Sequence, residues 1–79
     1  MHFEFEELTP IGYPGVLVTG WAQIETERGD WYVDDLFIGD YESTTDWAAL
    51  SKSDPLTVAI KRTLTAGKWA QLINDDLWG

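Results

Sequence analysis

Apolar and polar residues alternate near the start of the chain, where Phe3 and Phe5 are separated by a glutamate. A period of two residues is typical of a strand with one buried face, so residues 2–8 are predicted to form a strand. Similar but less regular patterns over residues 16–26 and 31–38 predict a second and a third strand.

Two tight turns are predicted from the positions of proline and glycine. Residues 13–16 have the sequence Tyr-Pro-Gly-Val, which suits a type II turn because the third position requires a positive φ. Residues 27–30 are Glu-Arg-Gly-Asp and predict a hairpin turn with Gly29 in the left-handed conformation. The second and third strands are therefore expected to be antiparallel neighbours.

The third strand carries large apolar residues on both faces, and each face also carries an aspartate. A β-bulge near Asp34 and Asp35 would shift the register and resolve this conflict. Without the bulge, the sequence leaves open which face of this strand is buried. In the second strand, Gly20 predicts either a bulge or a close packing contact.

Helical patterns begin after the third strand. The Ser-x-x-Asp sequence at residues 43–46 resembles a capping box, which predicts a short helix over residues 44–51. The Asp-Pro pair at residues 54–55 supplies an N-cap and a favoured first helical residue, and it predicts a helix over residues 55–65.

A single helix from residue 55 to 77 would place two apolar stripes on opposite sides. The stripes consist of Leu56, Ile60 and Leu64, and of Trp69, Leu72, Ile73 and Leu77. A break at Gly67 would let both stripes cover one core, so residues 68–77 are predicted to form a separate helix. Lys61 and Arg62 lie off the first stripe and are expected in solvent.

Together these elements predict an α+β fold, in which a three-stranded antiparallel sheet (a β-meander) is followed by two or three short helices packed on one face. A chain of 79 residues predicts one domain spanning residues 1–79. Because there is no cysteine, stability must come from a packed core rather than from disulfides or a thiolate zinc site. Hydrophobic residues make up 44% of the chain and include five Trp, which supply that core.

Fourteen acidic residues against five Lys and Arg give a net charge of −9, and the acids are unevenly distributed. Most of them precede residue 47, where Arg28 is the single Lys or Arg. The predicted helix over residues 55–65 is basic, but its cations are too few to neutralise the strands. Such dense like charge lowers folding stability, which favours a function that uses the field.

The acidity disfavours direct binding of nucleic acid or of an anionic membrane, because both require Lys and Arg. The N-terminal sequence MHFEFEEL does not resemble a signal peptide, and no apolar run approaches the roughly 18 residues of a membrane span. We therefore expect a soluble, cytoplasmic protein, and we favour a monomer over a homodimer.

The side chains needed for common catalytic mechanisms are missing. His2 is the single histidine and lies near the terminus, so the hydroxyl residues have no candidate base. The glycines do not form a phosphate-binding loop, and the acidic clusters do not match an EF-hand. We expect no enzymatic activity, no catalytic residues, no cofactor and no specific metal site, although clustered acids leave weak divalent-cation binding open.

The remaining hypothesis is binding by surface. Alternate residues of a strand lie about 6.6 Å apart on one face, so a sheet can hold carboxylates in rows that resemble a phosphate backbone. Glu4 with Glu6 forms one such row, and exposed aromatics such as Trp21, Trp31 and Tyr41 would anchor a partner. The predicted partner-binding residues are Glu25, Glu27, Asp30, Trp31, Asp34, Asp35, Asp40 and Glu42.

In size, acidity and lack of cysteine and catalytic motifs, the chain resembles the small inhibitors encoded by phages and prophages, in particular anti-CRISPR proteins that act on type I interference complexes. The resemblance covers the character of the whole chain and involves no shared motif. It implies binding to the Cas surface that receives target DNA or its PAM, in the cytoplasm of the host cell. The expected partner is then a basic DNA-binding protein or a Cas effector complex.

Two alternatives remain open. The chain could mimic DNA toward another DNA-binding enzyme, such as a restriction or repair enzyme. It could instead be a plain interaction or assembly module of phage origin, which would use an apolar patch or a sheet edge as its contact.

Overall fold

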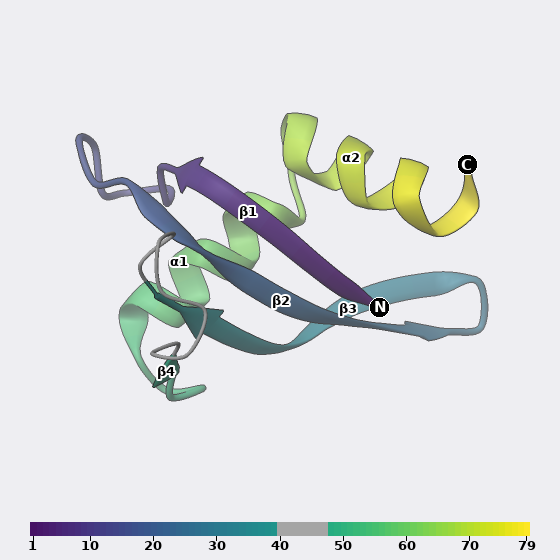
Figure 1. Ribbon diagram of the computed structural model, residues 1–79, viewed down its shortest axis with the longest axis horizontal. Coiled ribbons are helices and arrows are strands. Elements are labelled where there is room, and N and C mark those ends of the chain that lie inside the picture. The colour runs from purple at the N-terminus through teal and green to yellow at the C-terminus, as the bar shows by residue number, and fades with distance from the viewer. Residues whose placement is uncertain (40–47) are drawn as a thin grey trace.

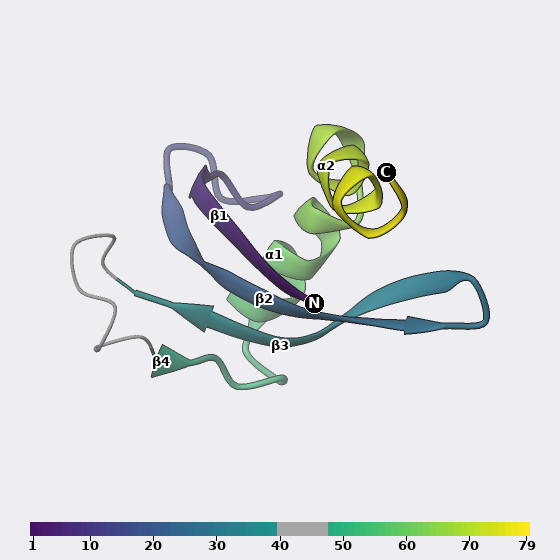
Figure 2. The ribbon, with the colours of Figure 1, turned by 45° about the vertical axis from the view of Figure 1, so that its right-hand side comes forward.

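The structure is a computed structural model that describes residues 1–39 and 48–79 (Figure 1). Its elements are β1 (His2–Leu8), β2 (Val18–Glu27), β3 (Asp30–Ile38), β4 (Ala48–Ala49), α1 (Pro55–Leu64) and α2 (Gly67–Trp78). The strands form one antiparallel sheet in the order β1-β2-β3-β4. Both helices lie on the same face of this sheet, which confirms the predicted α+β fold (Figure 2).

Both predicted turns are present. The Val16 amide donates to the Tyr13 carbonyl across 3.2 Å, and Gly15 has a φ of 83°, as a type II turn requires. The β2–β3 hairpin turns at Arg28 and Gly29, whose φ angles of 54° and 81° are both positive. Two left-handed residues are the signature of a type I′ turn, whose twist matches that of the flanking strands.

The second strand begins at Val18, whereas the sequence pattern had predicted that it begins at residue 16. Its neighbour β1 ends where Leu8 pairs with Val18, so residues before Val18 have no β1 residue to pair with. Val16 and Leu17 therefore belong to the preceding loop, where their side chains are exposed.

The predicted bulge lies at Asp34. Gln23 pairs with Asp35 while the next residue, Ile24, pairs with Val33, so Asp34 is the extra residue of β3. This shift places both Val33 and Leu36 on the buried face, which settles the question that the sequence left open.

A second irregularity, which the sequence pattern did not predict, lies in β1. The register shifts between Phe5 and Leu8, and Glu7 adopts a φ of 51°. The shift lets Leu8 join Phe3 and Phe5 on the buried face of the sheet.

The core fills the space between this face and the two helices. It consists of Phe3, Phe5, Leu8, Val18, Ala22, Ile24, Val33, Leu36, Ile60, Leu64 and Ile73. Trp69 of α2 packs edge-on against Phe3 and Phe5, with ring centroids 6.4 and 6.5 Å away. Burying each large side chain contributes about 1.5–3 kcal/mol, which is substantial for a small domain.

The two predicted helices form with nearly the predicted bounds. The carboxylate of Asp54 accepts a hydrogen bond from the Leu56 amide at 2.8 Å, and Pro55 is the first helical residue. The helical conformation is interrupted between Leu64 and Gly67, and as a result both helices contribute to one core. Leu72 was expected to cover this core but is 47% exposed, because α2 turns Ile73 inward instead. Neither helix has the length and apolarity needed to cross a membrane, within the residues described.

The predicted helix over residues 44–51 is wrong for its described part. Ala48–Ala49 instead forms β4 beside the end of β3, and Ser51 is not helical. The Leu50 amide donates to the Leu36 carbonyl across 2.9 Å, which keeps the chain extended along β3. The proposed capping box at residues 43–46 lies outside the described residues.

Candidate functional site

Neither helix covers the face of the sheet opposite the core, which we call the outer face (Figure 2). Buried and less buried residues alternate along β2, so the side chains of Thr19, Trp21, Gln23 and Glu25 lie on this face. The outer face therefore takes its side chains from the same strands that build the core.

Three aromatic rings from three strands form a row across the outer face: His2 of β1, Trp21 of β2 and Phe37 of β3. The His2 and Trp21 ring centroids are 4.2 Å apart with an interplanar angle of 24°. Trp21 and Phe37 are also 4.2 Å apart, with an angle of only 9°. Parallel rings this close can only stack face to face, since rings lying side by side in one plane would overlap.

This stacking limits what the ring row can bind. Trp21 has neighbours on both of its ring faces, so it cannot offer a free face to a nucleobase as single-strand-binding proteins do. What the row offers to a partner is a rigid apolar strip with ring edges outward. Ring edges carry partial positive charge and suit contact with polar oxygen atoms or apolar groups.

Carboxylates border the ring row. Glu4 lies opposite Trp21, and its Oε1 is 3.3 Å from Nε2 of His2. Glu25 accepts a hydrogen bond from the Gln23 amide group at 3.0 Å, and Asp35 lies opposite Gln23 on β3. These acids are anchored to a rigid sheet rather than to loops, which favours a defined spacing between their charges.

The β2–β3 hairpin end projects beyond the helices and carries the next group of acids (Figure 2). A shallow hollow of about 450 Å³ is lined there by Glu27, Arg28, Asp30, Trp31 and Tyr32. Glu27 and Asp30 are directly paired across the strands, and both are exposed. The Asp30 carboxylate also accepts a hydrogen bond from the Trp31 amide at 2.8 Å.

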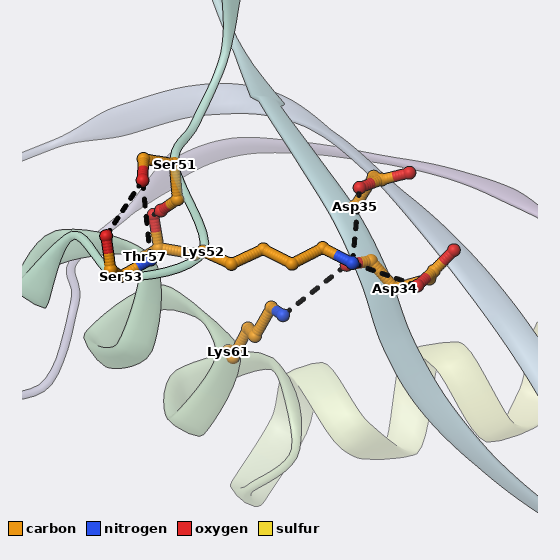
Figure 3. Close-up of polar contacts among 7 residues, drawn as sticks. All are labelled: Asp34, Asp35, Ser51, Lys52, Ser53, Thr57 and Lys61. Atoms are coloured by element: carbon orange, nitrogen blue, oxygen red, sulfur yellow. Dashed lines mark hydrogen bonds and ion pairs between the residues drawn. The ribbon is translucent and has the colours of Figure 1, made fainter.

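The two aspartates at the bulge are partly neutralised within the protein (Figure 3). The Lys52 Nζ lies 3.6 Å from the Asp34 carboxylate and 4.0 Å from that of Asp35. Lys61 was expected in solvent, but it is half-buried and its Nζ donates to the Asp34 carbonyl at 3.4 Å. The cations were expected to be too few to neutralise the acids of the strands, yet the carboxylates of Asp34 and Asp35 both have Lys52 within 4.0 Å.

Trp31, which was predicted to contact a partner, lies on the opposite side of the hairpin from the outer face. Its side chain packs against the core, and its indole Nε1 donates to Oδ1 of Asn74 at 2.9 Å. This contact ties the hairpin, close to its turn, to α2. Trp31 therefore has a structural role, although it also lines the hollow at the hairpin end.

The predicted site residues thus separate into two groups. Glu27, Asp30 and Trp31 meet at the hairpin end, whereas Asp34 and Asp35 meet at the bulge with Lys52. Glu25 lies between the groups, opposite Tyr32. Asp40, Glu42 and the aromatic Tyr41 lie outside the described residues.

The ring row was not predicted from the sequence, although Trp21 was named as a candidate exposed aromatic. A signal was available, because a two-residue turn at Arg28 and Gly29 followed by a bulge at Asp34 places Phe37 opposite Trp21. The role of His2 carried no such signal, since it pairs with Gln23 and reaches Trp21 diagonally.

Within residues 1–39 and 48–79, no three His, Asp or Glu side chains gather closely enough to hold a metal ion. No protein-family model, curated protein or solved structure matches the chain.

Proposed function

We propose that this chain is a non-enzymatic inhibitor that binds a basic, nucleic-acid-binding surface of another protein. The proposed contact surface consists of the outer face and the hairpin end. It would occupy Lys and Arg residues that otherwise hold a phosphate backbone.

The observation that supports this proposal most directly is the state of three acids on the hairpin: Glu25, Glu27 and Asp30. Among the described residues, Lys and Arg reach within 4.0 Å of acidic side chains at Asp34 and Asp35 alone. Glu27 and Asp30 are exposed and Glu25 is half-buried, and all three are fixed on a rigid sheet, so their charge is available to a partner.

The ring row supplies the second half of such a contact. Interfaces gain most of their affinity from a few aromatic or Arg side chains near the centre, while charged residues at the rim speed association. Trp21 lies opposite Glu4 of β1, and Phe37 lies two residues from Asp35 on β3, so carboxylates border the stacked rings on two strands.

The resemblance to small acidic phage inhibitors narrows the proposed target. On this proposal the chain binds the subunit of a type I CRISPR interference complex that receives target DNA or its PAM, and it blocks recognition of that DNA. A restriction or repair enzyme with a similar basic channel would be contacted by the same surface.

A pair of matched charge reversals tests the proposed surface. The double variant Glu27→Lys and Asp30→Lys changes the hairpin end, whereas Asp75→Lys and Asp76→Lys makes the same change in net charge on exposed positions of α2. Binding to purified type I complexes, and competition with target DNA, would be measured for both variants at two salt concentrations. We expect the hairpin variant to lose about tenfold or more in affinity, and the α2 variant to lose much less.

Equal losses in the two variants would show that net charge alone matters, and the proposed surface would be wrong. If neither variant weakened binding and the complex persisted at high salt, the acidic surface would not be the contact. The alternative of an apolar interaction module would then be favoured.

A further inference from the structure

The groove between β3 and α1 differs in charge from the rest of the molecule. It has a volume of about 380 Å³. The residues that define it, called the β3–α1 groove from here on, are Tyr32, Val33, Lys52, Val58, Lys61 and Arg62. Three of the five Lys and Arg residues of a chain with net charge −9 therefore line one groove.

The cations of the groove are positioned differently. Lys52 and Lys61 are held over the bulge by the Asp34 and Asp35 contacts, which places their charges at the rim. Arg62 is exposed and makes no ion pair with an acid of the described chain. A guanidinium in this position is free to bind a carboxylate with two parallel hydrogen bonds.

Apolar surface lies beside these charges. Val58 and Arg62 are four residues apart on α1 and share one face of the helix. Val58 is 43% exposed, and the half-buried Trp31 on the facing strand also lines the groove. The β3–α1 groove thus combines an apolar floor with a cationic rim.

The strand edge beside the groove has open hydrogen-bonding groups. Within the described residues, β4 pairs with β3 at Phe37 and Ile38 only. The Ile24 amide donates to the Met1 carbonyl on the β1 side, at 2.8 Å, so Ile24 points its backbone groups away from β3. Ile24 and Val33 are directly opposite each other and therefore form a non-hydrogen-bonded pair of the antiparallel ladder. The Val33 amide and carbonyl consequently also point away from β2, toward the open edge.

We propose that the β3–α1 groove binds a short, extended, acidic segment of a partner protein. The segment would add as a strand beside Val33, with carboxylates at Lys61 and Arg62 and an apolar side chain against Val58. This site is separate from the outer face and does not depend on the function proposed above. Charge complementarity selects an acidic segment, since the three cations of the groove outnumber the two aspartates beside Lys52.

A second copy of this chain is a poorer occupant. Antiparallel pairing of two β3 edges centred on Tyr32 would bring Asp30 of one copy beside Asp34 of the other. Like charges placed directly opposite each other destabilise a strand pair. Two chains of charge −9 would also repel each other at long range.

Fluorescence anisotropy with a labelled hexapeptide of alternating Val and Glu tests the proposal. A peptide of alternating Val and Lys is the probe of opposite charge. The variant Arg62→Glu is compared with Lys68→Glu, which makes the same charge change on α2, where Lys68 lies 5.5 Å from the Trp69 ring centroid and outside the groove. We expect Arg62→Glu to weaken binding of the Glu peptide about tenfold, and Lys68→Glu to weaken it about threefold or less.

Amide chemical shifts locate the bound peptide independently of these affinities. We expect the largest shifts at Val33 and along α1 near Arg62, and small shifts at Trp21 on the outer face. Equal effects of the two variants, stronger binding of the Lys peptide, or shifts centred on the outer face would each overturn the proposal. A concentration-dependent dimer in sedimentation equilibrium that Arg62→Glu abolishes would overturn it in favour of a second copy.

Discussion

The two faces of the sheet are built by alternate residues of the same strands, yet they differ in almost every physical respect. On the inner face, Phe5, Ile24 and Leu36 are nearly inaccessible and pack against the helices. On the outer face, the neighbouring positions hold partly exposed rings and carboxylates. The inner face accounts for the fold, whereas the outer face adds charge that the fold does not require.

The charges sharpen this difference. Lys61 follows directly after the buried Ile60 on α1, and it reaches across the edge of β3 to Asp34. The acids of the hairpin end have Arg28 beside them, but within the described residues no Lys or Arg comes within 4.0 Å of their carboxylates. The acids at the bulge are thus neutralised within the fold, whereas those at the hairpin end are the ones that the proposed function assigns to a partner.

Two phenylalanines on opposite faces give the largest expected contrast. Phe5→Ala should lower the free energy of unfolding by about 3–5 kcal/mol, because Phe5 is fully buried and the helices cannot close the resulting cavity. Phe37→Ala should cost about 1–2 kcal/mol, since it removes one partly exposed stacked ring. Urea denaturation followed by circular dichroism measures both values.

The total stability of a domain of this size is roughly 4–12 kcal/mol, so the Phe5 variant should be largely unfolded at the low end of that range. Equal losses for the two variants would mean that the outer face is as structural as the inner one. The division into a stabilising and a recognising face would then be wrong.

Gly20 provides a second test, because it lies on β2 at a point where β3 passes very close. A Cβ at Gly20 would overlap the carbonyl oxygen of Phe37 on β3. Gly20→Ala should therefore separate β2 from β3 and cost about 1–3 kcal/mol or more. Gly12→Ala is the control, because a Cβ at Gly12 has nothing within 4 Å and is disfavoured by its φ of 87° alone. Thermal unfolding should show the larger fall in midpoint for Gly20→Ala.

The inner face was largely predictable from the sequence, because burial produces a simple alternation. Phe3 and Phe5 lie inward as the period of two indicated, and the Asp34 bulge was inferred from the conflict of apolar residues on β3. At Gly20 the sequence left a bulge and a close packing contact open, and the structure shows the close contact. The prediction failed over Ala48–Ala49, where pairing with β3 outweighed a helical pattern.

The outer face was less predictable, because its contacts depend on register and on side chains that reach diagonally. The acids could be named from the sequence, but their pairing with Lys52 and Lys61 depends on how α1 crosses β3. Exposure of Leu72 likewise reflects a rotation of α2 that residue spacing did not determine. The contacts and the exposure of these surface residues could therefore be known only from the three-dimensional structure.

The smallest expected effect is a gain in stability, whereas the substitutions at Phe5 and Gly20 are expected to lower it. Glu27 and Asp30 are directly opposite each other beside the hairpin turn, and like charges in such a pair are destabilising. Glu27→Lys should raise the free energy of unfolding by about 0.5 kcal/mol, because it converts repulsion into attraction. The gain should shrink at high salt, which screens exposed charges. Urea denaturation at 20 mM and 500 mM salt would measure it.

The matched control for this gain is Glu6→Lys, which makes the same change in net charge at an exposed position of β1, away from the hairpin and from any helix end. A gain confined to Glu27→Lys would locate the repulsion at the hairpin, whereas equal gains would reflect the net charge of −9 alone. If Glu27→Lys instead destabilised the protein, the acid at this position would be structural. A hairpin that becomes more stable when an acid is removed has retained that acid at a cost to folding, and such a cost is expected where charge serves a partner rather than the fold.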